Sequence, residues 1–226
     1  MKKFVISLGG SVICPKEIDV KFLRRFYFFI KKEINRGLKF IIVAGGGHTA
    51  RGYQKAISKI KKVSNEDKDW LGIEATKLNA LLLKTILKKG SHPIIFDKRF
   101  KIKNFGKYPI IIGSGWKPGW STDFVTVQIA ADFKIKPVIL LGKPAYVYTA
   151  NPDENKNAKP IEKMSWEGYF KIIPKKWSPG LHAPVDPIAA KLAQKEKIPV
   201  IIAGGKDLKN FEKILKGEKF KGTILI

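Results

Sequence analysis

The sequence predicts an α/β fold, a three-layer α/β/α sandwich in which helices cover both faces of a mainly parallel sheet. Strand-like aliphatic runs alternate with helix-like segments from residue 4 to residue 141, the pattern of a parallel sheet with crossover helices. Two of these runs, residues 40–44 and 109–112, lead directly into glycine-rich turns. A chain of 226 residues is long enough for one substantial core, and we expect a single domain over residues 1–226.

Hydrophobic periodicity places the individual elements. Short apolar runs indicate buried strands at residues 4–8, 38–44, 93–96, 109–112, 137–141, 199–203 and, as a last edge strand, 222–226. Apolar residues at helical spacing indicate helices at residues 19–36, after Gly47, at 70–88, from Asp123 to Phe133, and at 186–195. Asp186 and Pro187 suit the N-cap and first turn of the last helix. The polar stretches 64–68 and 149–160 are expected to be loops.

The chain is strongly basic, with 44 Lys and Arg against 19 Asp and Glu and a formal net charge of +25. Such an excess favours anionic partners in general, including nucleotides, nucleic acid and anionic membranes. The lysines are spread from Lys2 to Lys221 rather than gathered in one tail. This dispersal favours a solvated basic surface, with non-specific nucleic-acid association as the alternative.

The expected compartment is the cytoplasm. A single cysteine, Cys14, has no intramolecular disulfide partner and fits a reducing environment. Residues 1–13 have the pattern of a strand rather than a signal peptide. No run of about eighteen apolar residues occurs, so we expect no membrane-spanning helix.

The two glycine-rich turns, residues 45–47 and 113–123, predict phosphate-bearing substrates. Glycine lets backbone N–H groups approach an anion closely, and a helix that begins after the turn adds its positive end. Neither turn has the Walker A or the Gly-x-Gly-x-x-Gly spacing, and no Gly-x-Ser-x-Gly elbow occurs. The three histidines, His48, His92 and His182, are scattered and form no metal-binding pattern.

Several segments in order resemble the uridylate (UMP) kinases of the amino acid kinase superfamily, most closely the archaeal type. One segment, residues 69–80, is similar to a helix with an acidic start and the pattern Gly-Ile-x-x-Thr-x-x-Asn-Ala. The others are Gly9-Gly10-Ser11, the Gly45–Gly47 turn with Arg51, residues 113–123, the run Val-Tyr-Thr-Ala-Asn-Pro at 147–152, and Asp-Pro-Ile-Ala-Ala-Lys at 186–191. The resemblance covers nearly the whole chain and implies the amino acid kinase fold.

The resemblance implies phosphoryl transfer from ATP to UMP, giving UDP and ADP in pyrimidine nucleotide biosynthesis. It places the UMP-binding half at about residues 1–135 and the ATP-binding half at about 136–226. The implied catalytic residues are Gly9, Gly10, Lys143 and Asp186. The implied UMP-binding residues are Gly45, Gly46, Arg51, Asp69, Thr122 and Asp123, and the ATP-binding residues are Ser11, Gly47, Tyr148, Asn151 and Pro152.

Each of these roles has a physical basis. Backbone N–H groups of the glycines suit the charge that spreads over the transferring group, and Arg51 suits a forked clamp on the UMP phosphate. Asp69 would accept from the ribose hydroxyls, the alternative being an ordinary carboxylate at a helix start. Thr122 and Asp123 would hold the acceptor phosphate and the neighbouring turn, the alternative being a helix cap. Mg²⁺ should bridge the ATP phosphates with few protein ligands, so no protein metal site is expected.

Two segments depart from the family pattern. Ser7 stands where many relatives have a lysine, two residues before the first glycine. In the segment 142–146, Gly142, Lys143, Ala145 and Tyr146 replace Thr, Asn, Asp and Gly. We hypothesise that Lys143 substitutes for the missing first-strand cation. Residues 166–184 also diverge from the expected small-residue loop.

The alternatives are a kinase for another small phosphate or carboxylate and a nucleotide-binding protein with weakened catalysis. The helix at 69–80 argues against the first, and the changes at 142–146 support the second. The resemblance also implies a homohexamer built from dimers, and the aromatic face between Phe22 and Ile30 is compatible with self-association.

Overall fold

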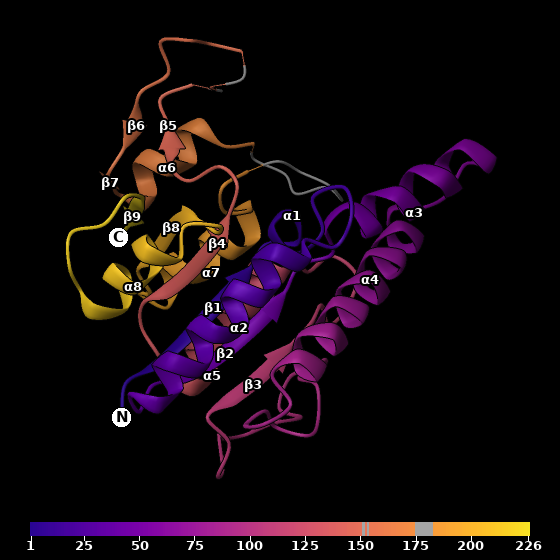
Figure 1. The fold of residues 1–226 in the computed structure, drawn as a ribbon. Coiled ribbons are helices and arrows are strands. Elements are labelled where there is room, and N and C mark those ends of the chain that lie inside the picture. Colours follow the sequence, from indigo (N-terminus) through magenta and orange to yellow (C-terminus); the bar gives the residue numbers. More distant parts are fainter. Residues whose placement is uncertain (151, 153, 175–182) are drawn as a thin grey trace.

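The computed structural model describes residues 1–150, 152, 154–174 and 183–226, which form a seven-stranded sheet in the order β3-β2-β1-β4-β8-β9-β7 (Figure 1). The strands are β1 (Lys3–Leu8), β2 (Lys39–Ala44), β3 (Ile110–Gly113), β4 (Val138–Gly142), β7 (Lys163–Met164), β8 (Val200–Gly204) and β9 (Thr223–Leu225). The first five in spatial order are parallel, β9 is antiparallel to β8, and β7 is parallel to β9. A separate antiparallel ribbon joins β5 (Val147–Tyr148) to β6 (Pro160–Ile161).

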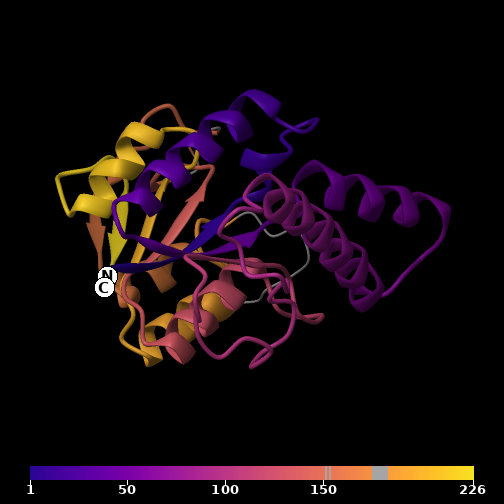
Figure 2. The same ribbon diagram turned by 60° about the horizontal axis from the view of Figure 1, so that its bottom comes forward.

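Helices cover both faces of this sheet, so the three-layer α/β/α prediction is confirmed (Figure 2). One core lies under α2, α4 and α8, and the other lies under α5, α6 and α7. Alternation along each strand supplies both cores: Ile6 of β1 enters the first and Val5 the second. The helices are α1 (Gly10–Ile13), α2 (Val20–Asn35), α3 (Gly47–Ile60), α4 (Asn65–Ile86), α5 (Thr122–Phe133), α6 (Trp166–Ile172), α7 (Pro187–Lys195) and α8 (Leu208–Lys216). None of the helices in the described ranges is long and apolar enough to cross a bilayer.

The α3–α4 hairpin extends away from the sheet, and α3 packs along α4 (Figures 1 and 2). Gly47 is the buried residue of α3, whereas Tyr53 and Ile60 are exposed. The α4 side of the hairpin also exposes the large apolar side chains of Trp70 and Leu78. The hairpin therefore presents apolar surface that the chain itself does not cover.

Three sequence predictions were wrong. Residues 93–96 form no strand. In the described structure, this part of the chain pairs with β3 only through isolated bridges at Ser91 and Phe96. The stretch 64–68 is not a loop: Ser64 and Asp67 form a capping box that begins α4 there. The final strand, predicted at the edge, lies between β8 and β7, because β9 enters the sheet antiparallel to β8.

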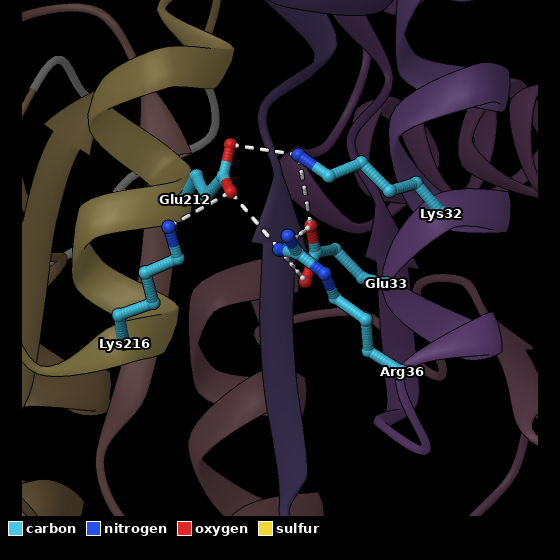
Figure 3. Close-up of polar contacts among 5 residues, drawn as sticks. All are labelled: Lys32, Glu33, Arg36, Glu212 and Lys216. Carbon is cyan, nitrogen blue, oxygen red and sulfur yellow. Dashed lines mark hydrogen bonds and ion pairs between the residues drawn. The ribbon is translucent and has the colours of Figure 1, made fainter.

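Charged side chains join α2 to α8 on the outer surface (Figure 3). Glu212 of α8 pairs with Lys32 at 2.9 Å, Arg36 at 3.0 Å and Lys216 at 3.0 Å. The buried carboxylate of Glu33 also pairs with Arg36, at 3.2 Å. Hydrogen bonds from these three cations lower the pKa of Glu212 to about 2.

Glu212→Gln should destabilise the protein at neutral pH by about 1 kcal/mol, the scale of a partly exposed ion pair. Because the pKa of Glu212 is lowered on folding, its contribution is present above the ordinary value of 4.5 and is lost as pH falls toward 2. Urea unfolding of both proteins should therefore give free energies that converge from pH 7 to pH 3. Glu218→Gln, at an exposed position outside the cluster, is the control. A difference that does not change with pH would contradict this assignment.

Candidate active site

The candidate site lies where the parallel strands end at their carboxyl edge. β1 leads to Gly9 and α1, β2 leads to Gly45–Gly47 and α3, β3 leads to the turn before α5, and β4 ends at Gly142. Parallel strands in an open α/β sheet bring their following loops together at this edge, which is where such folds bind ligands. The topology therefore gathers the two glycine turns that the sequence singled out.

The turns after β1 and β2 touch through their backbones. A Cβ on Gly10 would lie 1.9 Å from the nitrogen of Gly47, and a Cβ on Gly45 would lie 2.3 Å from the nitrogen of Gly10. Gly47 also has a φ of +66°, a region that side chains disfavour. These glycines are required by close backbone packing, whatever the ligand.

Hydrogen bonding narrows the set of available backbone donors. The N–H of Gly9 donates to Leu141 at 2.8 Å, and the N–H of Gly45 donates to Leu8 at 2.9 Å. Both groups thus serve the fold rather than a ligand. Among the described residues, no acceptor faces the N–H groups of Gly10, Ser11, Gly46 and Gly47.

Helix α4 holds both glycine turns through buried polar side chains. The Asn79 amide donates to the carbonyls of Gly45 at 2.7 Å and Gly46 at 3.2 Å. The Thr76 hydroxyl accepts from the N–H of Gly115 at 2.8 Å. The sequence motif that contains Thr76 and Asn79 therefore acts as a scaffold between two loops, a role that its pattern alone did not reveal.

Asp69 takes part in the same scaffold. Its carboxylate accepts from the N–H of Gly119 at 2.8 Å through Oδ2, and burial raises its pKa, against that hydrogen bond. Because α4 begins at Asn65, Asp69 lies in the second turn of the helix and not at its start. The predicted position of Asp69 at the start of the helix is therefore wrong. The alternative, in which Asp69 is an ordinary carboxylate at a helix start, is wrong for the same reason.

A second cluster joins β1, α5 and α7 through two serine–aspartate contacts. The Ser7 hydroxyl donates to Oδ1 of the largely buried Asp123 at 3.0 Å. The Ser121 hydroxyl donates to Asp186 and also accepts from the N–H of Phe124, so Ser121 is the N-cap of α5. The cap alternative for Thr122 and Asp123 is therefore wrong.

Asp186 is the N-cap of α7, as predicted. It accepts from the N–H groups of Ile188 at 2.8 Å and Ala189 at 3.0 Å. Burial raises its pKa, and burial together with the charge of Asp186 raises the pKa of Asp123 to about 7. Two buried carboxyls thus lie close together at the end of the cluster, and the hydroxyls of Ser7 and Ser121 hold them. Sequence reasoning had not assigned either serine to the site. The serine before the apolar run at 124–130 is an N-cap pattern that pointed to Ser121.

A cavity of about 180 Å³ opens beside this cluster. Its lining includes Ser7, Gly9, Ser11, Thr122, Asp123 and Lys143. Five of these were predicted site residues, and they come from three different parts of the chain. A lysine, hydroxyls and the start of α1 around one small cavity suit an anionic group.

Other predicted residues lie outside this cavity. Arg51 is exposed on α3 and has no ion pair in the described part of the chain. Tyr148 lies in the β5–β6 ribbon beside Tyr146, with ring centroids 6.0 Å apart, and Pro152 is exposed in a turn. Asn151 lies outside the described residues.

Comparisons with known proteins agree with this geometry. The sequence profile of the amino acid kinase family matches residues 2–204. The chain is 33% identical to a uridylate kinase of Pyrococcus abyssi, covering 98% of each chain, and 33% identical to one of Methanocorpusculum labreanum, covering 100% of this chain and 96% of the relative. The crystal structure of a uridylate kinase from Archaeoglobus fulgidus matches over 100% of both chains with a TM-score of 0.80 and 27% identity.

The raised pKa of Asp123 makes stability depend on pH. A carboxyl with a raised pKa favours the folded state below its ordinary value of 3.8, and this contribution is lost as pH rises to about 7. Asp123→Asn removes the dependence, so its advantage over the wild type should grow by about 2–3 kcal/mol from pH 5 to pH 8. Urea unfolding of the ligand-free proteins tests this, with exposed Glu17→Gln as the control. Parallel stabilities at the two pH values would count against it.

Proposed function

Because the chain belongs to the amino acid kinase family, we propose that it transfers the γ-phosphoryl group of ATP to UMP, giving UDP and ADP for pyrimidine nucleotide synthesis. The observation that carries this proposal is the scaffold on α4, whose Asp69, Thr76 and Asn79 bind both glycine turns. It lies in the segment that resembles the UMP kinases. The names of the relatives at 33% identity support the same substrate.

The chemistry asks for positioning more than for a strong base. The attacking oxygen belongs to the UMP phosphate, which is already ionised at neutral pH. The obstacle is the approach of two polyanions in line, so catalysis rests on alignment and charge neutralisation. The free N–H groups of Gly10, Ser11, Gly46 and Gly47 are suited to that task.

On the acceptor side, we assign UMP to residues 1–135. Oδ1 of Asp69 is available to the ribose hydroxyls, because the bond from Gly119 uses Oδ2. Arg51 projects from the first turns of α3, beyond Gly45 and Gly46, where it would clamp the UMP phosphate. Thr122 and Asp123 close the phosphate end of the acceptor site.

On the donor side, we assign ATP mainly to residues 136–226, with Ser11 and Gly47 of the first half toward its phosphates. Tyr148, Asn151 and Pro152 would border the adenine and ribose. Mg²⁺ belongs with the ATP phosphates, whose charge it neutralises when bound. The donor set fits this arrangement, since Asp123 and Asp186 are each already held by a serine hydroxyl.

The assembly and compartment are also proposals. The exposed apolar side chains of Tyr53, Ile60, Trp70 and Leu78 on the α3–α4 hairpin support self-association. By resemblance, the assembly is a homohexamer of dimers. The cytoplasm suits both the lone Cys14 and a reaction that uses ATP.

The function is tested by incubating purified protein with MgATP and UMP, CMP or no acceptor, and following UDP and ADP. We expect UDP to form in the reaction with UMP. We expect neither CDP in the reaction with CMP nor ADP in the reaction without acceptor to form at a comparable rate. Tight UMP binding without turnover would instead favour a nucleotide-binding protein. Phosphorylation of a different acceptor in preference to UMP would favour a kinase for another small substrate.

Lys143 supplies the positive charge that a lysine at position 7 would supply. Lys143 and Ser7 line the same cavity, which supports this role. Lys143→Met should lower kcat by about 100-fold or more, the usual loss when a group that stabilises transition-state charge is removed. Lys143→Arg should recover part of the rate, because it restores the charge. Steady-state kinetics with UMP and MgATP measure both variants, and thermal unfolding checks their fold. A near-normal kcat in Lys143→Met would remove Lys143 from catalysis.

A further inference from the structure

An open hollow of about 730 Å³ lies between α2 and α8, outside the candidate active site. Arg25 and Phe28 line it from α2, and the other lining residues are Lys206 and Asp207, just before α8, and Leu208 and Lys209 at its start. None of these residues belongs to the catalytic cavity. The two helices lie side by side on one outer face of the sheet (Figures 1 and 2).

This face is more basic than the chain as a whole. Residues 19–36 and 206–221 carry twelve Lys and Arg against five Asp and Glu, a net charge of +7 over 34 residues, compared with +25 over the 226 residues of the chain. Most of those carboxylates are already paired: Glu33 and Glu212 take up cations in the cluster of Figure 3, and Asp19 pairs with Lys206 at 2.5 Å. The carboxylates therefore neutralise only part of the face.

Several cations remain without an acidic partner. Within the described ranges, no ion pair involves Arg24, Arg25, Lys209 or Lys213. All four are exposed, and two of them line the hollow. The hollow thus has three cations and one carboxylate, Asp207, in its lining, and a groove with such an excess of positive charge is complementary to a chain of phosphates.

An exposed aromatic ring lies within this basic surface. Phe28 is 58% exposed. Its ring makes an edge-to-face contact with the ring of Tyr27, and the two ring centroids are 5.0 Å apart. Arg24 and Arg25 precede it by one turn of α2, and Lys31 and Lys32 follow it by one turn. Cations beside an aromatic face are the arrangement that single-stranded nucleic acid uses, with phosphates on the cations and a base on the ring.

We propose that the groove between α2 and α8 binds single-stranded nucleic acid, with its phosphates on Arg25 and Lys209 and a base stacked on Phe28. The 16 residues of α2 span about 24 Å, long enough for several nucleotides. A single exposed ring in a groove, rather than a broad apolar face, favours a strand over a lipid surface. The activity is separate from phosphoryl transfer.

The test is fluorescence anisotropy with labelled oligo(U) and oligo(dT) of about 12 nucleotides, titrated from about 25 to 300 mM NaCl in the presence of saturating UMP. Both strands should bind, with affinity falling as salt rises. Arg25→Glu with Lys209→Glu should weaken binding at least ten-fold and reduce the slope against log salt by about 1.4, since each phosphate contact contributes about 0.7. Phe28→Ala should weaken binding about five-fold with the slope unchanged, the effect of losing one stacked base.

The matched control is Lys171→Glu with Lys195→Glu, the same charge change on exposed positions of α6 and α7 over the opposite face. It should weaken binding much less than the groove variant, and every variant should keep UMP phosphorylation. Equal losses in groove and control variants would overturn the proposal in favour of general charge. Absence of binding at low salt, equal affinity for a duplex, or binding confined to phosphatidylglycerol vesicles would also overturn it.

Discussion

The hydrogen bonds from α4 to the two glycine turns are the constraint on which the candidate site depends. The turns follow the neighbouring strands β2 and β3, whose ladder ends at Val43 and Gly113, and side chains of α4 bond to the turn residues beyond that ladder. Asp69, Thr76 and Asn79 are separated by seven and three residues, spacings that place them on one face of the helix. Thr76 and Asn79 are buried, so each lost bond would leave a polar group unpartnered. One helix thus sets the distance between loops that must hold one substrate.

The other half of the site is governed by charge. Asp123 and Asp186 are buried near each other, and hydroxyl donors rather than cations hold them. A lysine at position 7 would pair directly with Asp123, whereas Ser7 leaves the cluster without a positive charge of its own. Lys143 enters the same cavity from the end of β4. The serine at position 7 and the lysine at position 143 therefore have complementary effects on the charge in the same small cavity.

Local sequence patterns predicted most of the fold because aliphatic strands and their helices have strong periodicity. They failed where the outcome depends on distant partners. Ile94 and Ile95 resemble a strand, but Ile94 is 45% exposed and no ladder forms there. The polar residues at 64–68 resemble a loop, although Ser64 and Asp67 cap a helix. The parallel topology places both glycine turns at the carboxyl edge of the sheet. The bonds from Asn79 to Gly45 and from Ser7 to Asp123 span 34 and 116 residues, and no local pattern encodes them.

The central claim is that α4 positions the turns that bind UMP, and calorimetric titration of UMP into Thr76→Val tests it most directly. Valine keeps the shape of threonine but offers no acceptor to the N–H of Gly115. Leaving that group unpartnered should weaken UMP binding at least about five-fold, with the affinity for a non-hydrolysable ATP analogue retained. Glu74→Gln, at an exposed position on the same helix, should bind UMP like the wild type. A folded Thr76→Val protein with unchanged UMP affinity would contradict the account.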